Sequence, residues 1–117
     1  MTKEPMKIIF RDAIHFVTYT FITKDWDSFS KEVRKQFPDY KEDIKDGKTI
    51  SITGRESFVF IFLKKFDVPT LAHEAVHATN AVFDSIGSEF GMKTDEHFAY
   101  YVQWIVGTIY HNRKKGI

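Results

Sequence analysis

Hydrophobic and polar residues alternate along this chain with two different periods, and each period predicts a different kind of element. Residues 14–22 are rich in β-branched and aromatic side chains, which predicts a strand. Residues 49–53 alternate between polar and apolar, and a short turn separates them from the apolar run 58–63, so the two segments predict a β-hairpin. Because the second of these strands is apolar on both faces, either it lies between two layers or one face is kept for another contact.

Three further segments carry apolar residues at helical spacing. The first is 26–37, the second begins near Pro69 and continues to Gly87, and the third runs from about Asp95 to Asn112. Together the elements predict an α+β fold, with a small, mostly antiparallel sheet, one helix in the N-terminal half and two C-terminal helices.

Length and composition predict one folded domain, 1–117, of ordinary globular type. The chain has 117 residues, of which 43% are hydrophobic and 28% are charged. Its 17 Lys and Arg residues nearly balance 16 Asp and Glu residues, so no net field attracts nucleic acid or anionic lipid. The basic run 113–115 complements the dipole at the end of the last helix, and we expect no nucleic-acid partner.

The absence of cysteine excludes disulfides, thiolate metal ligands and a cysteine nucleophile. No stretch has the features of a targeting segment, and the apolar run 98–110 is shorter than the roughly 20 residues of a membrane helix. We therefore expect a cytoplasmic protein without a membrane partner.

The second predicted helix carries His73-Glu-Ala-Val-His77. Residues four apart project from one face of a helix about one turn apart, so His73 and His77 can hold one metal ion. Glu74 then lies beside the metal, where it can take a proton from bound water without being a ligand. Histidines in a largely apolar helix also need partners, because an unpaired buried imidazole is destabilising.

A catalytic zinc needs a third protein ligand. The metzincin continuation requires glycine and histidine where this chain has Asn80 and Phe83, so that subclass is excluded. The third predicted helix opens with three adjacent candidates, Asp95, Glu96 and His97. At about 100° per residue only one of them can face the motif helix, and Glu96 shares its face with the small residues at 99 and 107.

The segment Glu96-His-Phe-Ala99, with 18 residues between His77 and Glu96, resembles the gluzincin branch of the zincin metallopeptidases. HEAVHATN followed by DEHFAYY is also similar to the small zincin-like proteins encoded by bacteriophages and prophages, over about residues 58–106. The resemblance implies a minimal zincin-like fold, a zinc cofactor, Glu96 as the third ligand and Glu74 as the general base. It also implies that the strand 58–63 runs along the cleft and pairs with an extended peptide.

The function expected from this resemblance is hydrolysis of a peptide or protein substrate, in the host cytoplasm if the protein is phage-encoded. Tyr100 is a candidate donor to the developing oxyanion, and its alternative role is packing. Asp95 either caps the helix or orients a zinc-binding histidine. Asn80 and Asp84 are expected to line the cleft.

A second hypothesis comes from another class of protein. The fold can serve as a binding or regulatory module in which zinc is mainly structural and no proteolysis occurs. The intact Glu74 argues against this alternative, because a structural zinc site has no use for a general base and closes its fourth position with another ligand. We assign His15 and His111 to the polar surface and not to the site.

Overall fold

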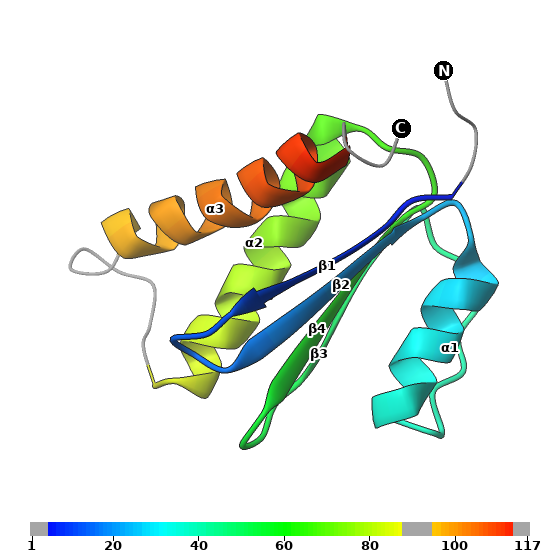
Figure 1. Ribbon diagram of the computed structural model, residues 1–117, viewed down its shortest axis with the longest axis horizontal. Coiled ribbons are helices and arrows are strands. Elements are labelled where there is room, and N and C mark those ends of the chain that lie inside the picture. Colours follow the sequence, from blue (N-terminus) through cyan, green and yellow to red (C-terminus); the bar gives the residue numbers. More distant parts are fainter. Residues whose placement is uncertain (1–4, 88–94, 114–117) are drawn as a thin grey trace.

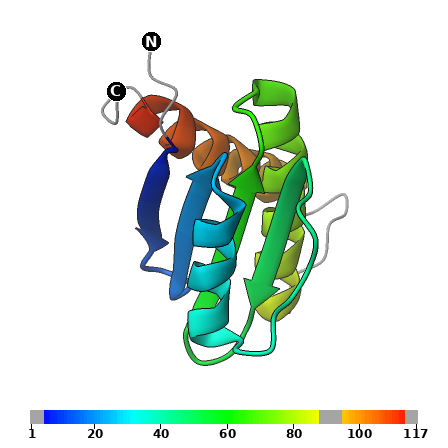
Figure 2. The ribbon, with the colours of Figure 1, turned by 90° about the vertical axis from the view of Figure 1, so that its right-hand side faces the viewer.

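The protein is an α+β structure in which one sheet separates a single helix from a pair of helices. A computed structural model describes residues 5–87 and 95–113, and Figures 1 and 2 show α1 on one face of the sheet and α2 and α3 on the other. The elements are β1 (Lys7–Asp12), β2 (Val17–Thr23), α1 (Trp26–Gln36), β3 (Gly47–Ile52), β4 (Ser57–Leu63), α2 (Val68–Ser85) and α3 (Asp95–Arg113).

The four strands lie in the order β1-β2-β4-β3. The pairs β1–β2 and β3–β4 are antiparallel, which confirms the predicted hairpin, while β2 and β4 are parallel. The two central strands, β2 and β4, are parallel because α1 and β3 lie between them in sequence. This connection brings the chain back to the end of the sheet at which β2 began, so that β4 runs in the same direction as β2. In the described part of the chain, β1 and β3 are the edge strands.

The apolar strand β4 lies between two helical layers. This is the first of the two alternatives that its two apolar faces left open. Phe60 and Phe62 pack towards α1 in one core cluster, whereas Val59, Ile61 and Leu63 pack with α2 and α3 in the other. Both backbone edges of β4 are used, by β2 and by β3. The expectation that residues 58–63 pair with a peptide is therefore wrong, and the neighbouring strand with an open edge on this side of the sheet is β3.

The helices begin and end close to their predicted limits. The side chain of Asp25 accepts a hydrogen bond from the backbone N–H of Ser28 at 3.0 Å and so caps α1. Pro69 lies in the first turn of α2, where its missing N–H costs no helical hydrogen bond. Within the described residues, no helix is both long enough and apolar enough to cross a membrane.

The sequence pattern missed β1 and placed the start of β2 too early. Ile8 and Phe10 of β1 pack against the core under α2 and α3, while Ile9 between them is 59% exposed. Residues 13–16 form the turn between the two strands, and Phe16 adopts a left-handed φ of 57° there. A β-branched and aromatic composition alone does not reveal such a turn.

Candidate metal centre

The motif helix α2 presents its two histidines on the side that is not used for packing. Leu71, Ala75 and Ala78 are fully buried against the sheet and α3, at the spacing that one helical face requires. His73 and His77 are exposed on a different face of the same helix. The apolar face therefore fixes how the helix lies, and the histidines are left free to bind.

The two imidazoles are close enough to share one ion. Their Nε2 atoms are 3.2 Å apart, and the rings are nearly perpendicular, with an interplanar angle of 77°. Two nitrogens bound to one tetrahedral zinc at about 2.0–2.1 Å lie roughly 3.3 Å apart. The histidine pair therefore fits a zinc ion, although the same distance also suits a hydrogen bond from one neutral ring to the other.

Glu74 lies between this pair and the edge strand β3, and it is 5% exposed. Its Oε1 accepts a hydrogen bond from the hydroxyl of Thr49 at 2.6 Å. A Cβ added at Gly47 would lie 2.9 Å from its Oε2, so only glycine lets the strand approach this closely. Two residues of β3 thus hold the carboxylate in place.

A cleft of about 480 Å³ runs between α2 and β3. Its lining residues are Lys45, Gly47, Lys48, Thr49, Ser51, His73, Glu74 and His77. Asn80 and Asp84, which the sequence placed along the cleft, are exposed on α2 but do not line it. The cleft is therefore built from the first half of the motif helix and from the open edge of the sheet.

The structure does not bring Glu96 to the histidine pair. No three His, Asp or Glu side chains within 5–87 and 95–113 form a group that could hold a metal ion, and Glu96 is exposed on the first turn of α3. The cause is the way α3 is anchored. Phe98 packs on Phe83, near the end of α2, and the hydroxyl of Tyr101 donates to Asp12 of β1 at 2.6 Å.

The neighbours of Glu96 are also placed away from the cleft. Asp95 is an exposed residue at the N-terminal end of α3, where a carboxylate complements the helix dipole. His97 and Tyr100 line a separate hollow beside the turn between β1 and β2, and Tyr100 is 63% exposed. The expected contact of Tyr100 with a reacting group in the cleft is therefore not present in this arrangement, because α3 begins over the opposite edge of the sheet.

Sequence analysis missed a partly buried polar cluster on that opposite edge. The Oδ2 atom of Asp12 accepts hydrogen bonds from the Tyr101 hydroxyl and from Nδ1 of His15, each at 2.6 Å. The hydroxyl of Tyr19 lies 2.6 Å from that of Tyr101 and donates to it, since Tyr101 donates to the carboxylate. His15, expected from the sequence on the polar surface, is thus part of a chain of hydrogen bonds.

Burial and hydrogen bonding shift the pKa of Asp12 in opposite directions. Burial raises the pKa of Asp12, but the hydrogen bonds from Tyr101 and His15 and the charge of His15 outweigh burial, so the pKa lies below its usual value. Burial also raises the pKa of both tyrosines far above their usual value, and the negative charge of Asp12 adds to this rise. At neutral pH the cluster consists of a carboxylate that accepts and two tyrosines that donate.

Comparison of the chain with protein families, with curated proteins and with solved structures found no match.

Proposed function

We propose that this protein is a zinc-dependent peptidase whose reaction takes place in the cleft between α2 and β3. The observation that carries the proposal is the 3.2 Å separation of the two histidine Nε2 atoms beside a buried carboxylate. Exposed histidines at this spacing, next to a glutamate that a strand holds in place, form two of the parts that a hydrolytic metal site needs.

In this proposal His73 and His77 hold the zinc. Bound zinc supplies a Lewis acid and lowers the pKa of a bound water towards about 7. The described residues provide no third protein ligand. Glu96 can take that position only if the start of α3 leaves its contacts with Phe83 and Asp12, and this part of the ligand set stays a prediction.

Glu74 is the general base of the proposal. Its Oε1 is engaged by Thr49, which leaves Oε2 as the oxygen that accepts a proton. The hydrogen bond and the close backbone of Gly47 restrict the rotation of the side chain, so the carboxylate is oriented before a substrate arrives. The same oxygen can then pass the proton to the leaving amine.

The open edge of β3 is the proposed binding surface for the peptide. In the described chain β3 pairs only with β4, so its other edge offers N–H and C=O groups beside the histidines. An extended peptide can add to such an edge as a further strand, with main-chain hydrogen bonds supplying affinity. The proposed peptide-binding strand is therefore β3, in place of the buried strand 58–63 that the resemblance implied.

The test uses zinc-loaded wild type and Glu74→Gln on a library of unfolded peptides, with cleavage products identified by mass spectrometry. The amide cannot accept a proton, so we expect hydrolysis to fall by at least about 100-fold while zinc content and fold are retained. Glu32→Gln, on the opposite face of the sheet, is the matched control and should cleave like wild type. Equal cleavage by wild type and Glu74→Gln would exclude the mechanism.

The alternative is a binding or regulatory module without hydrolysis. Two histidines alone do not complete a catalytic zinc site, and the described residues provide no third ligand, which counts against hydrolysis; a closed structural zinc site needs a fourth ligand as well. On this alternative, wild type and Glu74→Gln bind the same peptides along β3, and neither cleaves any of them.

A further inference from the structure

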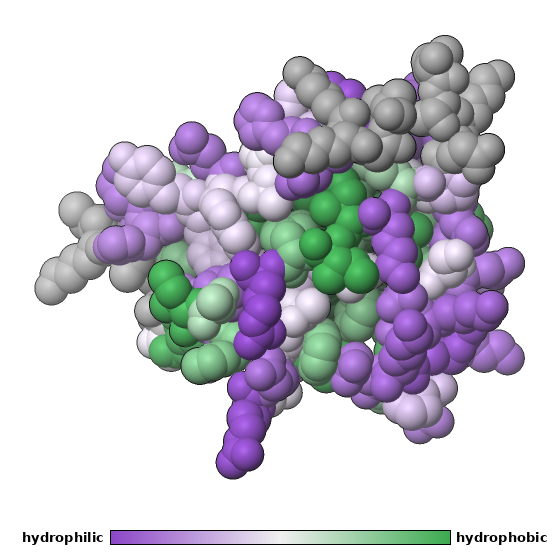
Figure 3. Space-filling view, in the orientation of Figure 1, coloured by the Kyte–Doolittle hydropathy of each residue, from purple (hydrophilic) through white to green (hydrophobic). Residues whose placement is uncertain are grey.

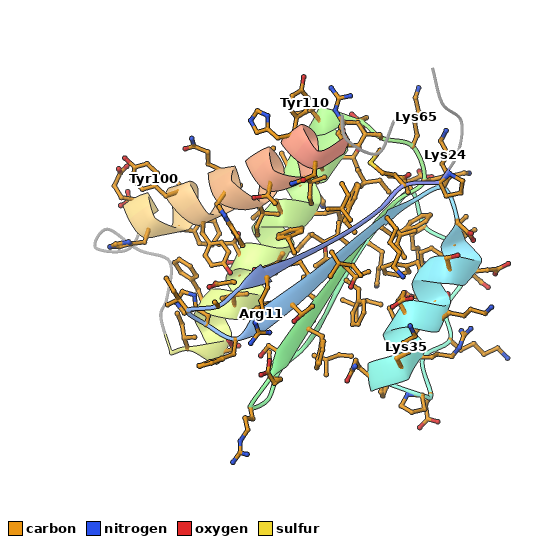
Figure 4. The ribbon with its side chains drawn as sticks, viewed as in Figure 1. Arg11, Lys24, Lys35, Lys65, Tyr100 and Tyr110 are labelled. Carbon is orange, nitrogen blue, oxygen red and sulfur yellow. The ribbon has the colours of Figure 1, made fainter. Side chains whose placement is uncertain are left out.

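A second hollow lies at the edge of the sheet opposite the histidine cleft. It has a volume of about 530 Å³ and is formed by the turn between β1 and β2 and by the first half of α3. Arg11 from β1 and Tyr100 from α3 are two of its lining residues (Figure 4), and hydrophobic surface is visible at this end of the molecule (Figure 3). Small-molecule sites have volumes of about 300–1,000 Å³, so the hollow is large enough to be one.

The walls of the hollow are aromatic rings in fixed orientations. Trp104 makes edge contacts with Phe10, Tyr19 and Tyr101, at centroid distances of 5.5, 5.8 and 5.5 Å, yet it remains 39% exposed. The ring of Tyr101 is fixed further by its hydrogen bond to Asp12. An exposed ring that packing already holds in place can stack on a flat ligand at little cost in conformational entropy.

The carboxylate in the hollow is already saturated. Asp12 accepts from the backbone N–H groups of Ile14 and His15 at 3.0 and 3.1 Å, and from the His15 ring and the Tyr101 hydroxyl at 2.6 Å. A carboxylate with four donors has little capacity left for a ligand. Asp12 therefore holds its neighbours in position and does not itself select a ligand.

The other polar groups of the lining are basic side chains. Because the ionised Asp12 can only accept, Nδ1 of His15 donates to it, and this hydrogen bond fixes the imidazole in the lining of the hollow. Arg11 lines the same hollow, and its guanidinium donates to the Thr18 hydroxyl at 2.9 Å and to the carboxylate of Glu56 at 3.2 and 3.4 Å. The side chains of Arg11 and Glu56 are 42% and 50% exposed, so a ligand carboxylate can take the place of Glu56 in this solvated pair. His97 adds a third basic side chain to the lining.

We propose that this hollow binds an aromatic carboxylate, with the ring on Trp104 and Tyr101 and the carboxylate at His15 and Arg11. The hollow complements such a ligand, because it has flat aromatic walls, three basic side chains and one acid whose acceptor capacity is already used. Such a group is found both in free aromatic acids and at the C-terminus of a peptide that ends in an aromatic residue. The site is independent of the proposed peptidase activity.

The experiment is an NMR titration of the full chain that follows the indole N–H of Trp104. The probes are indole-3-acetate, compared with indole-3-acetamide, and the tripeptide Gly-Gly-Phe, compared with its C-terminal amide. We expect saturable shifts at Trp104 but not at Trp26, and binding of the acids about tenfold tighter than of the amides, since a charge-assisted hydrogen bond is lost with the charge. Binding of only one of the two acids identifies which source of the group the site accepts.

Two variants locate the contact. His15→Ala should weaken binding of indole-3-acetate about tenfold, while His111→Ala, at an exposed histidine outside this hollow, should leave it unchanged. If His15→Ala does not fold, Arg11→Met replaces it, with the same expected direction. Equal affinity for acid and amide, unchanged binding by the folded variant, or no saturation in the millimolar range would overturn the proposal.

Discussion

The two edges of the sheet carry polar clusters that are assembled in different ways. At the β3 edge, His73, Glu74 and His77 come from two turns of one helix, and the histidines are exposed. At the β1 edge, Asp12 and Tyr101 are 89 residues apart in sequence and meet through a hydrogen bond of 2.6 Å. The first cluster follows from helical periodicity, whereas the second exists only once α3 has docked on the sheet.

The difference predicts different roles in stability. An exposed histidine pair contributes little to the free energy of unfolding, because both rings are solvated in the folded and in the unfolded chain. The Asp12 cluster joins a turn, a strand and a helix through hydrogen bonds to a charged group, and such bonds contribute about 1.5–3 kcal/mol each. We therefore expect substitution of the histidines at the β3 edge to change zinc binding with little effect on stability, and substitution of Asp12 at the β1 edge to lower stability.

The largest expected effect is the loss of zinc on replacing a histidine. His77→Ala should weaken zinc binding by more than about 100-fold, since removing even a residue that supports a ligand costs 10- to 100-fold. Equilibrium dialysis with zinc measures this, with His111→Ala as the control. If His77→Ala binds zinc as wild type does, the metal centre does not exist.

The second prediction concerns the β1 edge. Asp12→Ala should lower the free energy of unfolding by about 2–4 kcal/mol, because the ring of His15, the hydroxyl of Tyr101 and two backbone N–H groups lose their acceptor. Urea denaturation measures the change. Metal-free His77→Ala should differ from wild type by less than about 0.5 kcal/mol in the same assay. If Asp12→Ala and His77→Ala lowered the free energy of unfolding equally, the two edges would not differ in their contribution to stability.

The contribution of Asp12 should also depend on pH with a defined sign. Its pKa is lower in the folded protein than the ordinary value of 3.8, so its stabilising effect is fully present above that value and is lost as the pH falls through the lower, folded pKa. The difference in stability between wild type and Asp12→Asn should therefore shrink below about pH 4. A difference that grows on acidification would contradict this assignment.

A smaller effect is expected at the contact between β3 and Glu74. Gly47→Ala places a Cβ 2.9 Å from Oε2 of Glu74 and 3.0 Å from Cγ2 of Thr70, so the carboxylate must move. We expect a loss of about 1 kcal/mol in stability, together with a clear drop in any hydrolysis. Gly54→Ala, in the turn between β3 and β4, meets only a backbone oxygen at 3.5 Å and should change neither property.

The smallest effect, and the sharpest test of the ligand set, is expected at the start of α3. With α3 anchored at Asp12 and Phe83, Glu96→Ala and His97→Ala should each change zinc affinity by less than about threefold, well below the effect of losing a residue that supports a ligand. The gluzincin resemblance predicts instead a large loss for Glu96→Ala alone. That result would mean that α3 moves to the histidines when metal is bound, and it would restore Glu96 as the third ligand.

Much of the secondary structure follows from local pattern. The hairpin of β3 and β4 and all three helices are where alternation, caps and Pro69 place them, because these signals act within a few residues. The strand β1 was missed because its six residues, Lys7–Asp12, are apolar on the core side only through Ile8 and Phe10. Its strand conformation depends on pairing with β2, and a short local pattern does not predict such pairing.

The sequence by itself determined the α+β class, the helices and the pairing of His73 with His77, since helical spacing brings those two rings together in any fold that keeps α2 intact. Only the tertiary structure decided that β4 lies between β2 and β3, that β3 is the strand open beside the histidines, and that α3 begins over the β1 edge. The physical reason is range. Periodicity and capping act over one or two turns, whereas strand order and helix docking depend on burying Phe10, Tyr19 and Tyr101 together, and these residues are distant in sequence.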